Sequence, residues 1–235
     1  MNNRKIIYAI LIIVSMFFFY VATALSVDNN ITDEDIMAIE SLAVDKQCQN
    51  SKITFKSEIQ CLSSIQMAVQ SIGETRCAIS SDIIEPAEFI RRNYGCCFDR
   101  ARFIEKTARY YGYETRHLFL IQPKYNISVS NMLPLGQSSH ATSEILTSQG
   151  WLGVDSNEPF ILLDGQNNPS TYRNAIDNIT RFPSMQPKNF YSNNIDIIYG
   201  LYYRHGNFHG LNLPGPEYVF LNYSGIGIKF DYFAQ

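Results

Sequence analysis

A long apolar run opens the chain. Residues 6–25 carry no charged side chain, and about 20 residues of helix cross the roughly 30 Å hydrocarbon core of a bilayer. Arg4 and Lys5 precede the run, whereas the first acidic residue, Asp28, follows it. The positive-inside rule therefore predicts a cytoplasmic N-terminus, with residues 27–235 on the extracytoplasmic side.

The end of this run leaves two outcomes open. Ala22-Thr23-Ala24 fits a signal-peptidase site with cleavage before Leu25, which would make the protein secreted or periplasmic. The length of the run favours a retained anchor, which would hold the protein in the membrane through residues 6–25. A buried core helix is disfavoured because the run is apolar on every side. We therefore expect residues 1–26 to form one transmembrane or signal helix.

Helical periodicity dominates residues 32–112. Capping residues, first-turn acids and an N-terminal proline mark four helix starts, at Thr32, Ser57, Pro86 and about Cys97. Gly73 and Gly112 end the second and the fourth of these helices. Apolar residues recur at helical spacing within them, so we expect each helix to present one face to a core.

The period changes after Gly112. Residues 113–121 predict a strand, and residues 140–147 and 151–155 predict the two arms of a hairpin. Residues 160–163 predict a further strand. Helices followed by strands in this order indicate an α+β fold.

The C-terminal part shows weaker patterns. Residues 166–194 are rich in Asn, Pro and Ser, which predicts a long loop with a short helix at 171–178. Strand-like apolar runs return at 195–199 and 218–221. No internal repeat is visible.

Composition and charge narrow the function classes. The 235-residue chain is 46% hydrophobic and 17% charged, and its 15 Phe and 15 Tyr supply a sizeable core, which excludes low-complexity disorder. Without residues 1–26 the chain loses two of its 19 bases and none of its 22 acids, so its net charge is −5 rather than −3. Such an acidic domain offers no basic field to a phosphate backbone, so nucleic-acid binding is not expected.

Five cysteines fit an oxidising compartment. Cys48, Cys61, Cys77 and Cys96 allow two disulfides in three connectivities, which leaves Cys97 as the odd thiol. Cys48 and Cys77 flank the second predicted helix, so we expect one of them to bond to Cys61. A Cys96–Cys97 bridge with redox gating is a strained alternative. Zinc is disfavoured, because no Cys-x-x-Cys occurs and no His lies near the first three cysteines.

Cys97 is expected at a helix N-terminus. Unpaired backbone N–H groups and the positive end of the helix dipole stabilise a thiolate there. A turn at Gly95 would let the backbone enter the helix sharply and leave the sulfur at the floor of a cleft. Asp99, in the first turn, is expected to interact favourably with the helix dipole and to form local hydrogen bonds, rather than to act as a catalytic residue.

The hairpin brings a second pair of residues into reach. If Thr147 pairs with Gly150, Asp155 lies opposite Thr142, which shares a sheet face with His140. If Leu146 pairs with Gln149 instead, Asp155 lies directly opposite His140. In either register the Cβ atoms of His140 and Asp155 lie about 5–8 Å apart. A slip by one residue would put them on opposite faces.

Three segments resemble a known family. They are Gly95-x-Cys97-x-Asp99-x-Ala101 opening a helix, His140-Ala141 with Glu144 after it, and Gly150-Trp151 followed by Asp155. Together they resemble the transglutaminase-like superfamily, which is related to papain-type thiol proteases. The resemblance spans residues 93–156, and Tyr94-Gly95-x-Cys97-Phe98 is similar to the nucleophile segment of animal-type transglutaminases.

The resemblance implies roles for three residues. Cys97 takes the position of the nucleophile, His140 that of the general base and acid, and Asp155 that of the residue that orients the imidazole. It also implies a papain-like or transglutaminase-like core, with N-terminal helices packed on an antiparallel sheet. The family match does not fix a role for Glu144.

The chain also departs from the family pattern. Thr142 and Ser143 stand where many relatives carry Trp, and Trp151 is the only Trp in the sequence. No upstream Trp can therefore help to hold an oxyanion, which leaves the Cys97 backbone N–H as the expected donor. The calcium sites of the animal enzymes have no match, so no metal and no cofactor are expected.

The implied activity acts on protein or peptide amide bonds. Cys97 forms an acyl-thioester, and water or an amine then releases the acyl group, so the outcome is cleavage or transfer. We expect a catalytic domain at 27–165, with a helical part at 32–112 and a sheet part at 113–165. Residues 166–235 extend the same domain.

Other interpretations stay open. A non-catalytic binding or assembly module of the cell envelope would retain the fold, and a disulfide-handling redox protein is disfavoured by the missing Cys-x-x-Cys. His205 and His209 lie four apart, but Gly206 and Gly210 argue against a metal-binding helix and favour a loop over the cleft. Sequons occur at Asn30, Asn126, Asn178 and Asn222.

Overall fold

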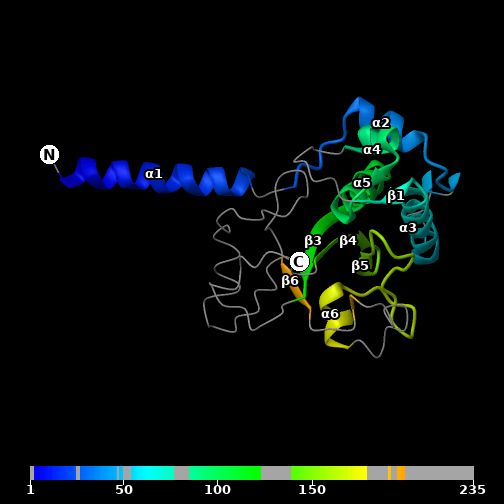
Figure 1. The fold of residues 1–235 in the computed structure, drawn as a ribbon. Helices are drawn as coiled ribbons and strands as arrows, with labels where there is room; N and C mark the ends of the chain where they lie inside the picture. The colour runs from blue at the N-terminus through cyan, green and yellow to red at the C-terminus, as the bar shows by residue number, and fades with distance from the viewer. Residues whose placement is uncertain are drawn as a thin grey trace.

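The protein combines helices with an antiparallel sheet, as its α+β pattern predicts (Figure 1). The computed structural model describes residues 3–24, 27–46, 48–49, 54–76, 85–122, 139–178, 190–191 and 195–198. The helices are α1 (Asn3–Ala24), α2 (Asp33–Glu40), α3 (Phe55–Gln70), α4 (Pro86–Arg92), α5 (Cys97–Tyr110) and α6 (Tyr172–Asp177). The strands are β1 (Glu74–Thr75), β2 (Tyr94–Gly95), β3 (Glu114–Ile121), β4 (Ser139–Thr147), β5 (Gly150–Val154) and β6 (Asp196–Ile198).

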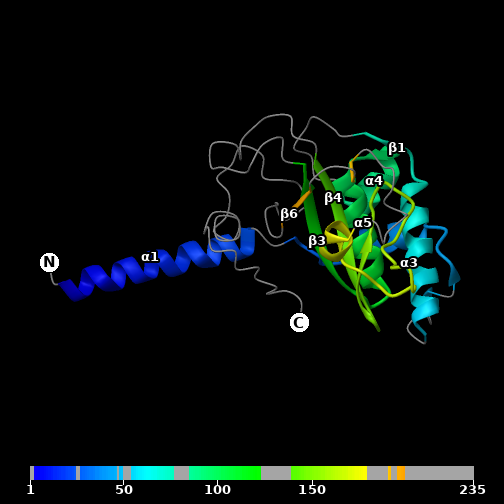
Figure 2. The same cartoon turned by 90° about the horizontal axis from the view of Figure 1, so that it is seen from below.

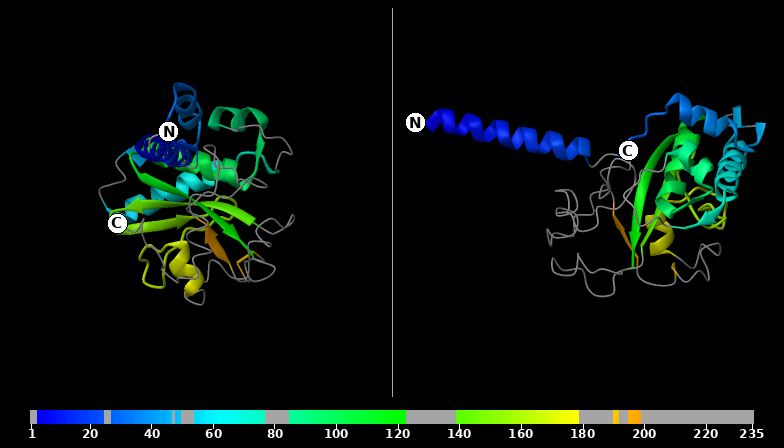
Figure 3. Two further views of the ribbon diagram at one scale, coloured as in Figure 1. Left: turned by 90° about the vertical axis from the view of Figure 1, so that its left-hand side faces the viewer. Right: turned by 45° about the horizontal axis from the view of Figure 1, so that its top comes forward.

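Helix α1 projects away from the other elements (Figures 1 and 3). Its large apolar side chains from Ile6 to Phe19 are exposed. Across the part of the chain that the structure describes, no helix combines the length and apolarity needed to cross a membrane. The transmembrane or signal helix expected over residues 1–26 stays a prediction.

The capping residues account for the helix starts. Thr32 caps α2 in a capping box, in which its hydroxyl accepts from the Asp35 N–H at 3.2 Å and the Asp35 carboxylate accepts from the Thr32 N–H at 2.9 Å. For α3 the predicted start at Ser57 is three residues late. Thr54 is the cap, and Ser57 occupies the third helical position of its box.

Glu58 lies one position after Ser57, and its carboxylate accepts hydrogen bonds from the Ser148 N–H, at 3.1 and 3.0 Å. Glu58 is buried, and it ties α3 to the turn between β4 and β5.

The four-stranded sheet has the order β5-β4-β3-β6 with antiparallel pairs throughout. Thr147 pairs with Gly150, which confirms the first of the two predicted hairpin registers. Helices α2 to α5 cover one face of this sheet, and α5 packs directly against β3 and β4 (Figure 2). The strand expected at 160–163 is wrong: Ile161 and Leu163 form only isolated bridges, with Val154 and Pro169.

Close packing of the Phe89 ring on Gly95 fixes the backbone just before α5. Strands β1 and β2 pair in parallel, so Thr75 lies opposite Gly95. A Cβ atom at Gly95 would lie 1.8 Å from the ring of Phe89. Only glycine fits at this point, two residues before Cys97, because the Phe89 ring already occupies the space of a side chain.

Two apolar clusters make up the core. The first lies between the helices and the sheet and includes Leu62, Ile65, Phe103 and Ile145. The second contains Leu118 and Leu120 of β3, Ile197 of β6 and the rings of Tyr172 and Tyr191. The second cluster includes Tyr172, Ala175, Tyr191, Ile195 and Ile197 from beyond residue 165. The place of residues 166–235 as an extension of the same domain stays a prediction.

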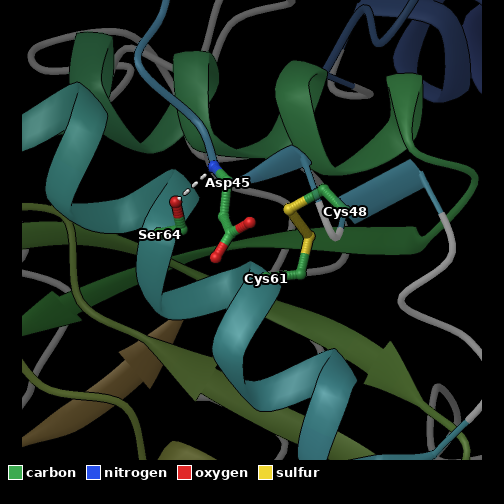
Figure 4. Close-up of a disulfide and its surroundings, with 4 residues drawn as sticks. All are labelled: Asp45, Cys48, Cys61 and Ser64. Carbon is green, nitrogen blue, oxygen red and sulfur yellow. Dashed lines mark hydrogen bonds between the residues drawn. A yellow bond between two sulfur atoms is a disulfide. The ribbon is translucent and has the colours of Figure 1, made fainter.

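One disulfide joins Cys48 to Cys61 of α3, which confirms the predicted bond to Cys61 (Figure 4). Close to it, the Asp45 N–H donates to the Ser64 hydroxyl at 2.8 Å. Cys96 is also disulfide-bonded, and Cys97 is free. The predictions for Cys77, His205, His209, Asn126, Asn222 and the run 218–221 lie outside the described residues.

In the C-terminal part the structure confirms two predictions. Helix α6 falls within the predicted span 171–178, where the Thr171 hydroxyl caps it by accepting from the Asn174 N–H at 3.2 Å. Strand β6 lies within the predicted run 195–199 and pairs with β3.

Candidate active site

Cys97 is the first residue of α5, as the sequence predicts. Its thiol is free and half-buried, and the Cys96 sulfur lies 4.0 Å from its sulfur. The first N–H groups of a helix have no carbonyl partner within the helix. The Cys97 N–H is one of these groups, so it suits the expected role of donor to an oxyanion.

Asp99 secures this helix start. Its Oδ2 accepts from the Cys96 N–H at 2.7 Å, as expected for a first-turn residue with local hydrogen bonds. Burial raises the pKa of Asp99 to about 7, against the lowering effects of the Cys96 N–H and of Arg92 and Arg102. Asp99 therefore holds the backbone that carries Cys97.

His140 contacts both of the other predicted site residues. It lies at the start of β4, with Nε2 at 3.1 and 3.2 Å from the two carboxylate oxygens of Asp155. Burial lowers the pKa of His140, but the Asp155 charge, the hydrogen bond to Asp155 and a hydrogen bond with the Cys97 side chain raise it to about 10. Because Nε2 faces Asp155, Nδ1 is the ring nitrogen left for Cys97.

Asp155 follows the last residue of β5 and is fully buried. Its Oδ1 accepts from the N–H groups of Asn157 and Glu158, each at 2.8 Å. Burial alone would raise its pKa, yet His140, the Tyr191 hydroxyl and the Glu158 N–H together lower it. A buried carboxylate with these donors stays ionised and can stabilise an imidazolium.

The structure thus brings Cys97, His140 and Asp155 together. They come from the N-terminus of α5, the start of β4 and the end of β5. The contact between α5 and β4 brings the thiol to the imidazole, and the hairpin register brings the carboxylate.

Two glutamines of α3 position the loop after β5. Gln66 donates to the backbone carbonyls of Asp155 at 2.8 Å and Phe160 at 2.7 Å. Gln70 donates to the Asp155 carbonyl at 3.2 Å. Neither glutamine was predicted from the sequence. Gln66 follows Leu62 by one helical turn on the buried face, and a polar residue on an apolar face is the signal that would have found it.

Two tyrosines that were not predicted from the sequence also contact Asp155. The Tyr172 hydroxyl lies 3.3 Å from Asp155 Oδ2, and the Tyr191 hydroxyl also contacts this oxygen. The ring of Phe190 meets His140 edge-on, with centroids 5.6 Å apart. None of these three residues lies in a strong periodic pattern, so the sequence carries no signal for them.

Glu144, for which the resemblance fixed no role, positions one of these tyrosines. Its Oε1 accepts from the Tyr172 N–H at 2.7 Å, and Oε2 accepts from the Arg116 Nε at 2.6 Å. The Arg116 guanidinium in turn lies 4.3 Å from the ring centroid of Trp151. The one Trp of the chain therefore supports Arg116.

Comparisons with known proteins do not place the chain in a family. No protein-family model matches it, and no curated protein matches it. Among solved structures, one match is a crystal structure of Rad4-Rad23 bound to a 6-4 photoproduct UV lesion, with a TM-score of 0.36 and 11% sequence identity. The match covers 74% of this chain and 45% of the other, so the chain spans less than half of that relative. A similarity this low carries no argument about fold or function.

Proposed function

We propose that this protein is a cysteine enzyme of transglutaminase-like type that cleaves or transfers protein or peptide amide bonds. One observation carries the proposal: the Cys97 thiol at a helix N-terminus is hydrogen-bonded to His140, whose Nε2 lies 3.1 Å from Asp155 Oδ1. A nucleophile, a base and a group that orients the base form the minimal set for covalent acyl transfer.

The residues act in the following order. His140 takes the Cys97 proton, and the thiolate attacks the carbonyl carbon, so that a C–S bond forms. The C–N bond then breaks, and the proton on His140 moves to the leaving amine. An acyl-thioester on Cys97 remains, and water or a second amine releases it. Asp155 stabilises the imidazolium between the two proton transfers, and the Cys97 N–H faces the developing oxyanion.

The electrostatics of the pair support this role. The raised pKa of His140 favours its protonated form beside Cys97, and an imidazolium stabilises a neighbouring thiolate. The lowered pKa of Asp155 keeps its carboxylate charged across the neutral range. Both groups are almost fully buried, so water screens their attraction little.

We also propose an extracytoplasmic location. The apolar run at residues 6–25, with Arg4 and Lys5 before it, favours export with or without a retained anchor. The Cys48–Cys61 disulfide is consistent with an oxidising compartment. Protease treatment of spheroplasts that carry a C-terminally tagged chain, together with an assay of the fluid outside them, tests this. The tag is expected to be digested or found outside, and a tag that stays protected inside the spheroplasts contradicts export.

Activity tests the enzyme proposal. Purified protein is incubated with a glutamine-containing peptide library, with and without a dye-labelled primary amine. Mass spectrometry is expected to show new carboxylates or amine adducts on the peptides. Cys97→Ala and Cys97→Ser should abolish both products, and equal turnover by Cys97→Ala would refute the assignment.

A second function stays open because of the oxyanion site. Among the residues that the structure describes, we identify no side-chain donor to an oxyanion beside the Cys97 N–H, and Trp151 contacts Arg116. This favours, as an alternative, a binding or assembly module that keeps the fold without turnover. Peptide binding by wild type and Cys97→Ala with equal affinity, together with no product from wild type, would support that module.

A further inference from the structure

Apart from His140, whose Nε2 reaches both oxygens at 3.1 and 3.2 Å, the two oxygens of the Asp155 carboxylate have different kinds of partner. Oδ1 accepts from two backbone N–H groups, those of Asn157 and Glu158. Oδ2 is contacted by two phenols, those of Tyr172 and Tyr191. The backbone of the loop after β5 therefore satisfies one oxygen, whereas side chains from beyond residue 165 serve the other.

Both phenols are neutral and keep their protons. Burial, and next the negative charge of Asp155, raise the pKa of Tyr172 and of Tyr191 well above the ordinary value for tyrosine. A protonated phenol beside a carboxylate can donate a charge-assisted hydrogen bond. Each hydroxyl has one proton to give.

Counting these protons separates the two tyrosines. Thr142 Oγ1 donates its own proton to the Val154 carbonyl at 2.8 Å, so it can accept from Tyr172, whose oxygen lies 2.8 Å away. That distance is shorter than the 3.3 Å from Tyr172 to Asp155 Oδ2. The Tyr172 proton therefore favours Thr142, and Tyr191 is the phenol that serves Oδ2.

The ring of Tyr191 lies between the carboxylate and several aromatic neighbours. It stacks on Tyr172 at an interplanar angle of 22° and meets Phe160 and Phe190 edge-on, at 5.6 and 5.3 Å. Phe190 continues this wall to the His140 ring. Tyr191 is 2% exposed, so the ring excludes water from the Asp155 side of the pair.

We propose that Tyr191 is a positioning residue for the thiol chemistry, because its phenol holds Asp155 ionised and directed at His140 while its ring closes the pair to water. The inference rests on the proposed function, since it assigns a role in preparing Cys97. It also assigns part of the site to the segment beyond residue 165. Residues 93–156, which resemble the family, supply Cys97, His140 and Asp155, and the later segment supplies the phenol of Tyr191.

The test follows the alkylation of Cys97 by iodoacetamide as a function of pH, read by peptide mass spectrometry, and therefore needs no substrate. The Tyr191 hydroxyl lowers the pKa of Asp155, so Tyr191→Phe should raise that pKa. Asp155 then becomes protonated at a higher pH, and the pair of Cys97 thiolate and His140 imidazolium that it stabilises is lost at that higher pH. We expect the acid limb of the profile to move up by about one pH unit, the size of one charge-assisted hydrogen bond. Tyr172→Phe should move it less, and Tyr110→Phe, an exposed phenol bonded to Glu40, should not move it.

The outcomes separate this inference from the proposed function. If wild-type Cys97 reacts no faster than a free thiol at neutral pH, the proposed function fails. If wild-type Cys97 is alkylated rapidly but the acid limb of Tyr191→Phe lies at the same pH as that of wild type, the positioning role of Tyr191 is wrong and the proposed function is unaffected. If Tyr172→Phe moves the acid limb as far as Tyr191→Phe does, the assignment of the Tyr172 proton to Thr142 is wrong. If Tyr191→Phe lowers the rate of Cys97 alkylation at every pH without moving the acid limb, Tyr191 has only a structural role and the proposal is overturned.

A second substitution decides the case in which Tyr191→Phe does not fold. Site-specific 3-fluorotyrosine at position 191 keeps the shape and the hydroxyl but makes the phenol a stronger donor. The acid limb is then expected to move to lower pH than in wild type. An unmoved or raised limb overturns the proposal.

Discussion

His140 and Asp155 stand 15 residues apart in the chain, and their side chains meet at 3.1 Å in the fold. The turn between β4 and β5 brings them together, because Thr147 pairs with Gly150 and the two arms then keep both side chains on one face. Asp155 lies just past the ladder, where the loop donates two N–H groups to its carboxylate. The pair is thus fixed from the hairpin and from the loop.

Asp155→Asn tests the role of the carboxylate. The amide keeps the size of the side chain but removes the charge that raises the pKa of His140. We expect the activity, and the reactivity of Cys97 near neutral pH, to fall by about 10²- to 10⁴-fold, the range of positioned acid–base catalysis. Asp164→Asn, in an exposed turn, is the matched control, and a loss of similar size in both variants would count against the assignment.

Gln66→Leu tests the support of the loop after β5. The substitution removes the donor that reaches the Asp155 and Phe160 carbonyls at 2.8 and 2.7 Å, and leaves them only the longer bonds from Gln70 at 3.2 Å and from the Asp155 N–H at 3.3 Å. We expect a loss of about 1–3 kcal/mol in the free energy of unfolding, measured in urea, and slower alkylation of Cys97. Gln70→Leu should cost less, because Gln66 still serves the Asp155 carbonyl. A smaller cost for Gln66→Leu than for Gln70→Leu would contradict this account.

Lys106→Met tests a buried ion pair between α2 and α5. Lys106 Nζ lies 2.7 Å from Asp35 Oδ2 and 2.8 Å from Glu85 Oε2, and the side chains of Lys106 and Asp35 are 3% and 2% exposed. Removing the ammonium leaves Asp35 as a buried charge, which should cost about 3–5 kcal/mol in the free energy of unfolding.

Two variants control this prediction. Asp35→Leu combined with Lys106→Met removes both charges and should recover much of the loss. Arg91→Ala removes an exposed ion pair with Glu88 and should change stability by less than about 1 kcal/mol. If Lys106→Met costs no more than Arg91→Ala, the buried pair does not stabilise the fold.

Glu85 predicts a dependence of stability on pH. Burial opposes its ionisation, but Arg102 and Lys106 lower its pKa from 4.5 to about 2. A carboxyl whose pKa is lower in the folded state stabilises the protein above pH 4.5, and this contribution is lost as the pH falls towards 2. Because the Glu85 side chain is 34% exposed, we expect only about 1–2 kcal/mol. Urea unfolding of wild type and Glu85→Gln should differ at pH 6 and converge near pH 2, and a constant difference would contradict the prediction.

His140 contributes in the opposite direction. Its pKa rises from 6.5 to about 10 on folding, so its stabilising contribution is fully present below pH 6.5 and is lost as the pH rises towards 10. The two contributions together predict a stability maximum between about pH 4.5 and 6.5 for these groups.

The sequence contained enough information to single out the three residues that the fold brings together, Cys97, His140 and Asp155. Short-range rules place Cys97 at a helix start, and the two-residue turn limits the hairpin to registers in which His140 and Asp155 share a face. Thr54 shows where such rules fail, because both Thr54 and Ser57 are good caps, and Ser57 instead occupies the third helical position of the Thr54 capping box.

The supporting groups could not be predicted in the same way. Tyr191 follows a segment rich in Asn, Pro and Ser, where no period connects it to the strands, and its contact with Asp155 spans 36 residues. The wrong strand at 160–163 has a related cause: Phe160 and Leu162 are apolar because they pack in the second core cluster beside α6. Burial alone therefore produced the strand-like pattern.

The reactivity of Cys97 shows whether His140 activates this thiol. The second-order rate constant for iodoacetamide at pH 7 is measured for Cys97 in the wild type, in His140→Ala and in an unstructured peptide that carries one cysteine. We expect wild-type Cys97 to react about tenfold faster than the peptide thiol. In His140→Ala, Cys97 should react no faster than the peptide thiol. Equal rates for wild type, variant and peptide would contradict this expectation.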